Sequence, residues 1–288
     1  MNTFYIITNH QKDENLEMTR KIQTYLEEHQ KNCYIQCEGE CCPGPHKYHF
    51  TNAESIPQDV ECVLVLGGDG TLIQGARDIV DRNIPILGFN LGTLGFLTEI
   101  EQENMYTALD KLMADEYILE SRMMLKGTMY HNDQAMYTDI ALNDIVLNRS
   151  GALRIVNYDI YVNGDFLYSC PADGIIISTP TGSTGYNLSA GGPIVSPSSF
   201  MILLTPICPH SLNSSSIVFS AEDKIVVKLG KGRRNTQEEA DATFDGAQSV
   251  QLITGDYVEI TQAKETTKLI KISQKSFVET MRKKMQFN

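Results

Sequence analysis

Short apolar runs alternate with amphipathic stretches in the first part of the chain. The apolar runs predict strands at residues 4–7, 62–66 and 84–89. Apolar side chains three or four residues apart predict helices at residues 14–28, 72–80 and 105–113. Asp13 is positioned to cap the first helix, and the last two strands are apolar on both faces, as buried parallel strands are. This alternation predicts a βαβ architecture.

The pattern changes near residue 123, where short strands separated by turn residues begin. Asn163-Gly164 and Asp245-Gly246 predict hairpin turns, and strands at this spacing are typical of a two-sheet domain. Residues 274–284 return to helical spacing. We therefore predict an α/β domain followed by an all-β domain: a Rossmann-like domain of residues 1–122 plus 273–288, and a β-sandwich domain of residues 123–272.

A glycine-rich pentapeptide, Gly67-Gly68-Asp69-Gly70-Thr71, directly follows the second predicted strand. Glycine lets a phosphate approach the backbone closely, and the N–H groups at the start of the next helix favour anions. A carboxylate in such a site makes sense if Asp69 accepts a proton from an attacking hydroxyl or helps to hold magnesium. For the pentapeptide alone, an Asp-Gly turn that caps a helix is the alternative. No Gly-x4-Gly-Lys-Ser/Thr sequence occurs, so a P-loop is excluded.

A second glycine-rich loop, residues 90–96, follows the next predicted strand. The carboxyl ends of neighbouring parallel strands lie at one edge of a sheet, so the two loops are expected to form a crevice together. Phe96, at the end of this loop, either packs into the core or contacts a ring of the substrate.

Two polar segments interrupt the predicted β domain. Asn143-Asp144 lies in an apolar strand-like segment, where a buried carboxylate is costly unless a bulge, a turn or ligand hydroxyls compensate. Residues 178–189, which follow Asp173-Gly174 and a run of isoleucines, are dense in hydroxyls and glycines. Hydroxyls suit the mixed edge of an adenine, and N–H groups between glycines suit phosphates. A surface loop is the alternative for this stretch alone.

These four segments, in this order, resemble the NAD kinase family over nearly the whole chain. The first loop alone is shared with diacylglycerol and sphingosine kinases and with phosphofructokinases, whereas its combination with residues 178–189 is specific. The resemblance implies an α/β domain, a β-sandwich, and a C-terminal helix that returns to the first domain. It also implies magnesium-dependent phosphoryl transfer from ATP, another triphosphate or polyphosphate to the 2′-hydroxyl of the adenosine ribose of NAD.

The resemblance also implies roles for individual residues. Asp69 is the expected base or orienting carboxylate, and no protein ligand of a metal is assigned. The implied substrate-binding residues are Gly68, Gly70, Thr71, Phe96, Asn143, Asp144, Arg154, Asp173, Thr181, Ser183, Thr184, Gly185, Tyr186, Asn187, Leu188 and Ser189. Asn143 and Asp144 are expected at the adenosine of NAD, and Thr184, Tyr186 and Ser189 around its adenine and phosphates. Asp173 is expected near the nicotinamide half, in the family often across a subunit contact, which implies a homodimer or homotetramer.

Some positions depart from the family pattern or keep two readings. Ala172 stands where the family commonly has glycine, Gly185 where alanine is usual, and Asp144 where glutamate is frequent. Arg154 matches an often basic, ligand-contacting position, with an exposed strand charge as the alternative. His210 fits a structural role as well as a ligand-facing one.

Composition narrows the possible partners and the compartment. A net charge of −12 disfavours nucleic acid and anionic membranes, because both bind net cationic surfaces. No apolar run approaches the roughly 18 residues that span a bilayer. The N-terminus lacks the pattern of an export signal, so a cytoplasmic protein is expected.

Two clusters of residues each have two possible interpretations. The first joins cysteines and histidines, at Cys33, Cys37, Cys41, Cys42, His46 and His49. It suggests zinc but lacks a distant second pair of ligands, so a reduced loop is favoured. The second cluster, Lys231, Arg233 and Arg234, is either a funnel for polyanions or a solvated hairpin tip.

Two other functions compete with the kinase interpretation. A diacylglycerol-type lipid kinase would need attraction to a membrane, which the net charge of −12 and the lack of a basic amphipathic helix oppose. The other competitor is a non-catalytic sensor that binds NAD. Asp69 opposes it, because a site for a polyanion gains nothing from a carboxylate unless chemistry or a cation requires one.

Overall fold

The computed structural model describes residues 1–36, 50–93, 95–151, 155–211, 215–232, 236–273 and 275–285. The chain forms two compact units, Met1–Ser121 with Thr267–Asn288, and Arg122–Thr266. The first unit is mixed α/β and includes the C-terminal helix, whereas the second is almost entirely β.

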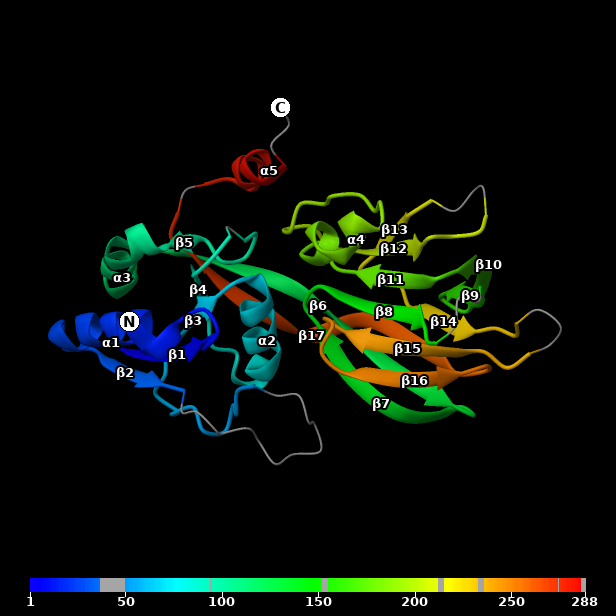
Figure 1. The fold of residues 1–288 in the computed structure, drawn as a ribbon, viewed down its shortest axis with the longest axis horizontal. Coiled ribbons are helices and arrows are strands. Elements are labelled where there is room, and N and C mark those ends of the chain that lie inside the picture. The colour runs from blue at the N-terminus through cyan, green and yellow to red at the C-terminus, as the bar shows by residue number, and fades with distance from the viewer. Residues whose placement is uncertain are drawn as a thin grey trace. The chain divides into compact units, whose positions relative to one another are not determined.

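The first unit is built on a parallel sheet with helices on both faces (Figure 1). Its strands are β1 (Thr3–Thr8), β2 (Asn32–Ile35), β3 (Cys62–Gly67), β4 (Ile86–Asn90) and β5 (Ile100–Glu101). Its α-helices are α1 (Glu17–Glu28), α2 (Asp69–Asp78), α3 (Met105–Met113) and α5 (Phe277–Met285). Short 3-10 turns are η1 (Glu14–Leu16), η2 (Val80–Arg82) and η3 (Gln102–Asn104).

The order β2-β1-β3-β4 places β3 in the middle of this sheet, and β5 pairs with β4. Every residue of β3 is buried because both faces of the sheet are covered. α1 and α3 share one core with Ile6 and Leu64, and α2 packs on the other face, where Gly75 lies against Ile7 and Val65. This is the doubly wound arrangement that places loops at the carboxyl ends of the strands.

The first predicted helix begins later than its periodicity indicated. Asn15 and Leu16 both have a φ of 58°, and this left-handed backbone breaks the predicted helix into η1 and α1. Asp13 still acts as a cap, because its carboxylate accepts hydrogen bonds from the N–H groups of Met18 and Thr19 at 2.8 and 2.9 Å. The predicted helix at residues 105–113 coincides with α3.

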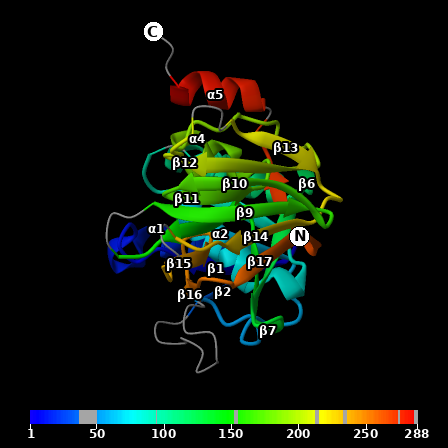
Figure 2. The same cartoon turned by 90° about the vertical axis from the view of Figure 1, so that its right-hand side faces the viewer.

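The second unit consists of two antiparallel sheets around one core. The first sheet has the order β10-β9-β14-β17, and β6 pairs with both β17 and β7. Its strands are β6 (Ile118–His131), β7 (Gln134–Ala141), β9 (Val156–Val162), β10 (Asp165–Ala172), β14 (Ile225–Leu229) and β17 (Tyr257–Lys271). β6 begins and β17 ends in residues of the first unit. Figure 2 shows β9 and β10 as neighbouring strands.

The second sheet of this unit has the order β13-β12-β11-β8-β15-β16. Its strands are β8 (Asp144–Arg149), β11 (Gly174–Ser178), β12 (Met201–Ile207), β13 (Ile217–Ser220), β15 (Glu239–Phe244) and β16 (Ser249–Ile253). The turn η4 (Gly182–Thr184) and the short helix α4 (Tyr186–Ser189) follow β11. Both predicted hairpin turns are present: Asn163-Gly164 joins β9 to β10, and Asp245-Gly246 lies between β15 and β16, all four residues having positive φ.

Within the described ranges, no helix is both long and apolar enough to cross a membrane. Of the predicted cysteine and histidine cluster, only Cys33 lies in the described part of the chain. Cys37, Cys41, Cys42, His46 and His49 lie outside the described residues.

Candidate active site

The glycine-rich loop forms a tight turn between β3 and α2. A Cβ on Gly67 would collide with the side chain of Thr71, so glycine is required at the last position of β3. α2 begins at Asp69, immediately after this turn. Because the first N–H groups of a helix have no partner within the helix, the turn offers donors to an anion.

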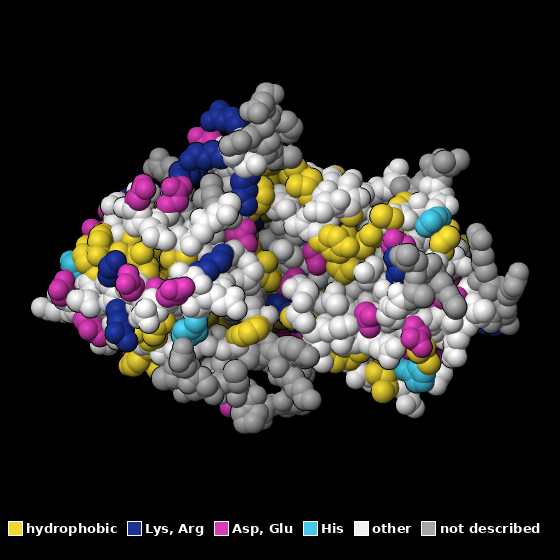
Figure 3. All heavy atoms as spheres, viewed as in Figure 1, with side chains coloured by type: hydrophobic (Ala, Val, Ile, Leu, Met, Phe, Trp, Pro, Cys, Tyr) yellow, Lys and Arg dark blue, Asp and Glu magenta, His cyan; other side chains and the backbone are white. Residues whose placement is uncertain are grey.

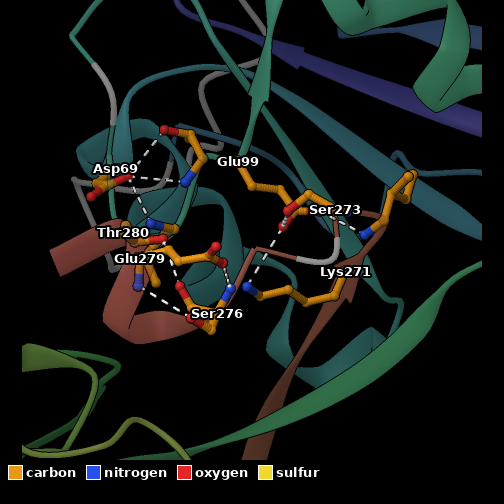
Figure 4. A network of polar contacts seen from close by, with 10 residues as sticks. Asp69, Glu99, Lys271, Ser273, Ser276, Glu279 and Thr280 are labelled. Atoms are coloured by element: carbon orange, nitrogen blue, oxygen red, sulfur yellow. Dashed lines mark hydrogen bonds and ion pairs between the residues drawn. The ribbon is translucent and has the colours of Figure 1, made fainter. Parts of the chain in front are cut away.

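The carboxylate of Asp69 joins the two glycine-rich loops of the first unit. Its Oδ2 accepts a hydrogen bond from the Phe96 N–H at 2.6 Å. Its Oδ1 accepts bonds from the Leu97 N–H at 3.1 Å, the Thr98 N–H at 3.0 Å and the Thr98 hydroxyl at 3.1 Å. Figure 4 shows Asp69 with dashed lines to this segment. A carboxylate oxygen has two lone pairs, so Oδ2 keeps capacity for one more donor.

A cavity of about 450 Å³ opens beside Asp69. It is lined by Asn9, Lys12, Gly68, Asp69, Gly70, Thr71, Thr93, Gly95 and Lys284. Asp69 and its predicted neighbours Gly68, Gly70 and Thr71 are therefore brought together. Sequence reasoning missed Asn9, Lys12 and Lys284. A signal existed for Lys12, because it follows β1, whose carboxyl end lies at the same sheet edge as that of β3.

Phe96 was predicted either to pack into the core or to contact a ring of the substrate, and its environment in the structure is intermediate between the two. Its side chain is half-buried, and its ring lies 6.2 Å from the ring of Phe277 on α5. The Nζ of Lys284 lies 4.3 Å from the centre of the Phe96 ring, which is the geometry of a cation–π contact. In this structure α5 therefore covers part of the ring that was predicted to meet a substrate.

Asn143 and Asp144 lie at the start of β8, in a turn organised by a second carboxylate. Asp245 accepts hydrogen bonds from the N–H groups of Leu142, Asn143 and Asp144 at 2.7, 2.8 and 3.0 Å. Asp144 is buried, and this burial, with the negative charge of Asp245 nearby, raises the pKa of Asp144 to about 7. The Oδ1 of Asn143 is buried and has no hydrogen-bond partner among the described residues. The described residues therefore leave the Asn143 side-chain oxygen without the hydrogen bond that a buried polar atom normally has.

The hydroxyl-rich loop divides into an inner and an outer set of side chains. Ser183 and Asn187 are fully buried. The Ser183 hydroxyl donates to Pro180 O at 2.7 Å, and the Asn187 amide donates to Pro193 O at 3.0 Å and accepts from the Thr205 hydroxyl at 2.7 Å. These two side chains hold the loop in shape, and whether they also contact a ligand stays a prediction.

The outer set of this loop is accessible or unsatisfied. Tyr186 and Ser189 are exposed, and Thr184, Gly185 and Leu188 are half-buried. The hydroxyl oxygen of Thr181 is buried without a partner among the described residues. The loop also packs onto Asn143, since a Cβ on Gly182 would collide with the Asn143 carbonyl and one on Gly185 would lie 3.3 Å from its side-chain nitrogen. The structure thus brings Asn143 and residues 181–189 together.

The remaining residues singled out in the sequence either form local contacts or lie outside the described residues. Asp173 forms an ion pair with Arg149 in which the Arg149 Nε lies 2.9 Å from Oδ1. Arg154 lies outside the described residues, as do Arg233 and Arg234 of the basic cluster. The N–H of His210 donates to the Pro171 carbonyl at 2.8 Å.

The fold and the site together define a class of protein in which an α/β unit, with a glycine-rich loop at its sheet edge, is followed by a unit that is almost entirely β. Residues 4–117 match the family of the ATP-NAD kinase N-terminal domain, and residues 142–272 match that of the ATP-NAD kinase C-terminal domain. The chain therefore belongs to the NAD kinase family.

Relatives and solved structures agree with this assignment. The chain is 44% identical to an NAD kinase of Lachnospira eligens, over 99% of this chain and 100% of that protein. It is 46% identical to an NAD kinase of Lachnoclostridium phytofermentans, over 99% of each. A yeast NADH kinase solved in complex with NADH superposes with a TM-score of 0.83 at 25% identity, covering 100% of this chain and 88% of that one. An NAD kinase from Archaeoglobus fulgidus in complex with ATP shares the fold, with a TM-score of 0.74 at 23% identity over 99% of each chain.

Proposed function

We propose that this chain is an NAD kinase, which transfers a phosphoryl group to the 2′-hydroxyl of the adenosine ribose of NAD and so forms NADP. The donor is ATP, another triphosphate or polyphosphate. Membership of the NAD kinase family supports the proposal. The single observation that carries it is the Asp69 carboxylate, fixed by four hydrogen bonds at the wall of a cavity beside a glycine-rich loop.

In the proposed reaction, Asp69 acts through its Oδ2 atom, which accepts one hydrogen bond from the residues that the structure describes. Oδ2 takes the proton of the 2′-hydroxyl while the ribose oxygen attacks the terminal phosphorus of the donor. The bond between that phosphorus and the bridging oxygen breaks, and with ATP the leaving group is ADP. Positioning supplies most of the acceleration in such transfers, and a general base adds a factor on the order of 10² to 10⁴.

We propose that a divalent cation, magnesium by the usual chemistry of triphosphates, accompanies the donor. In the described part of the chain no group of three or more His, Cys, Asp or Glu side chains gathers, and Asp69 is the one carboxylate that lines the cavity. This donor set fits an ion held mainly by phosphate oxygens and water, with Asp69 as the protein carboxylate nearest to it. When bound, the ion neutralises charge on the transferred phosphoryl group.

The acceptor subsites and the assembly are also part of the proposal. Asn143, Asp144 and residues 181–189 bind the adenosine and phosphates of NAD. In support, the side-chain oxygens of Asn143 and Thr181 have no hydrogen-bond partner in the described part of the chain. Asp173 binds the nicotinamide half. By resemblance to the family, the protein forms a homodimer or homotetramer and acts in the cytoplasm.

The test is formation of NADP from NAD, ATP and magnesium, coupled to an NADP-specific dehydrogenase. Asp69→Asn should retain NAD binding and lose on the order of 10²- to 10⁴-fold in turnover. In this variant an amide nitrogen also faces one or more of the donors that bind the carboxylate oxygens in the wild type. The free energy of unfolding should therefore fall as well. Thr98→Val is the matched control, because it removes one donor to Asp69 and leaves the carboxylate in place.

The kinase proposal requires that Thr98→Val turn over within a few-fold of wild type while Asp69→Asn does not. Equal loss in both variants would contradict the role of Asp69 as a base. Tight NAD binding by wild type without NADP formation, from any triphosphate or polyphosphate, would contradict the kinase and favour the sensor.

A further inference from the structure

Two lysines from opposite ends of the chain lie at the Asp69 cavity, and the family resemblance implied a binding role for neither of them. Lys12 lies in the turn after β1, and Lys284 lies in the last turn of α5. Both side chains are exposed, and neither forms an ion pair with any residue in the described ranges. Their ammonium groups are therefore available to an anion in the cavity.

The backbone around Lys12 is anchored on both sides. The Asn9 N–H donates to Leu66 O at 2.8 Å, and the Asn9 amide donates to the Thr71 hydroxyl at 3.1 Å. The Lys12 N–H donates to Asn9 O at 2.9 Å. On the other side, Asp13 is fixed by its bonds to the start of α1. Lys12 thus has a fixed base and a free end.

The free end of Lys12 reaches across both glycine-rich loops. Its Nζ lies 2.9 Å from the position that a Cβ on Gly68 would take, and 3.3 Å from the corresponding position on Gly92. A side chain at either glycine would push this ammonium group away. The two loops therefore leave space for a cation directly above the backbone that is expected to receive phosphate.

Lys284 reaches the cavity because α5 is tethered to the same unit. Glu99 accepts hydrogen bonds from the N–H groups of Ile272 and Ser273 at 2.6 and 3.2 Å, and its carboxylate lies 3.6 Å from the Lys271 Nζ (Figure 4). α5 then starts with a capping box between Ser276 and Glu279.

The far end of α5 is strongly basic. Arg282, Lys283 and Lys284 occupy its last turn. Figure 3 shows Lys and Arg side chains gathered over this helix at the top of the view. Among these cations, Lys284 is the one that lines the cavity.

We propose that Lys12 and Lys284 together bind the polyphosphate chain of the donor, and we call this pair of lysines the clamp. A triphosphate carries several negative charges, and the cavity already contains the Asp69 carboxylate, so cations must balance them. Lys12 and Lys284 are the charged groups that provide this balance among the described lining residues, since the others apart from Asp69 are uncharged.

The present contact of Lys284 is weak enough to be exchanged. An exposed cation–π contact is weaker than a charge-assisted hydrogen bond to phosphate. When phosphate enters, Lys284 therefore leaves the face of the Phe96 ring and turns to the anion. This exchange also uncovers the face of the Phe96 ring, which was expected to contact a ring of the substrate.

The clamp rests on the proposed kinase activity, but its test is separable from it. Inorganic tripolyphosphate is the probe, and its affinity is measured by calorimetry without NAD, in the full-length protein. Lys12→Met and Lys284→Met should each weaken tripolyphosphate binding about 10-fold. Lys284→Arg should restore most of the affinity, and the affinity of both methionine variants should depend less on salt than that of wild type.

Matched controls lie on the same elements. Lys283→Met removes the neighbouring charge on α5, and Lys21→Met removes an exposed charge on α1. Both should bind tripolyphosphate within twofold of wild type. In the NADP assay, the clamp variants should raise the KM for the donor about 10-fold and leave the KM for NAD within twofold.

Each outcome separates the two proposals. Unchanged tripolyphosphate affinity in Lys12→Met and Lys284→Met overturns the clamp, whether or not NADP forms. Equal weakening in the Lys283→Met and Lys21→Met controls also overturns it, because the effect would then be one of net charge. Lysine-dependent binding in a protein that makes no NADP supports the clamp and overturns the kinase.

Discussion

The carboxylate of Asp69 lies where a side chain on residue 95 would stand. A Cβ on Gly95 would collide with Asp69 Oδ1, and the Thr98 hydroxyl would crowd it as well. Gly95 does not have positive φ, so glycine is required there for space and not for backbone conformation. The second loop therefore has its glycine because Asp69 must reach the N–H groups beyond it.

Gly95→Ala should displace the Asp69 carboxylate and break several of its four hydrogen bonds. We expect the free energy of unfolding to fall by roughly 2 kcal/mol and NADP formation to fall at least 100-fold. Urea unfolding and the coupled assay measure these quantities.

Gly70→Ala is the matched control for the stability measurement. Its added Cβ meets nothing within 4 Å, and residue 70 lies in α2, where alanine is favoured over glycine. Unfolding of this variant should require as much urea as wild type or more. If Gly95→Ala were equally stable, Asp69 would have to tolerate displacement, which the four hydrogen bonds argue against.

Glu99→Gln should loosen α5 without unfolding the first unit. The amide keeps one acceptor oxygen but loses the charge that faces Lys271 and the second oxygen that accepts the Ser273 hydroxyl. We expect faster hydrogen exchange in residues 275–285, with the exchange of β3 unchanged. Glu103→Gln, an exposed residue of η3, is the control and should leave α5 as in wild type. Equal exchange in both variants would show that Glu99 does not hold the helix.

Local sequence signals predicted the framework of the site. The apolar run of β3 followed by glycines and a helical pattern placed Asp69 at a sheet edge, because each of these signals lies within a few neighbouring residues. Lys284 gave no such signal. Periodicity predicts that α5 is a helix, but its contact with Phe96 depends on tertiary docking through Glu99.

The hydroxyl-rich loop shows a second limit of sequence reasoning. Composition gives every hydroxyl and amide in residues 178–189 the same expected role. In the structure Ser183 and Asn187 point into the loop and satisfy its backbone, while Tyr186 is 43% exposed. Only the packing of the loop against Asn143 and Thr205 separates the side chains that shape it from those that face outward.

Asp144 should make the stability of the protein depend on pH. Its folded pKa of about 7 is raised by burial and by Asp245, above its unfolded value near 3.8. A raised folded pKa means that the protonated form is favoured on folding. The contribution of Asp144 to the free energy of unfolding is therefore fully present below about pH 4 and is lost as the pH rises through 7.

Asp144→Asn removes this titration and keeps the shape of the side chain. The free energy of unfolding of the variant, measured with urea, should rise by roughly 2 to 3 kcal/mol relative to that of wild type as the pH increases from 5 to 8. Asp139→Asn, on the less buried strand β7, is the control and should show a much smaller change. A pH-independent difference between Asp144→Asn and wild type would show that Asp144 is not held in a desolvated site.

Thr205→Val should separate the shape of the hydroxyl-rich loop from its chemistry. The Thr205 hydroxyl donates to the Asn187 side-chain oxygen at 2.7 Å and contacts the Ser216 hydroxyl at 2.9 Å, and the first of these acceptors is fully buried. Valine leaves the Asn187 oxygen without its donor, so the free energy of unfolding should fall by about 1 to 3 kcal/mol. Because the inner set of side chains holds the outer set in place, the KM for NAD should rise while the KM for the donor stays unchanged.

Thr138→Val is the control, because its exposed hydroxyl pairs with that of Thr128 at 3.1 Å. This variant should alter neither the free energy of unfolding nor the KM for NAD. A Thr205→Val protein with lowered stability but an unchanged KM for NAD would show that the buried network does not shape the acceptor site.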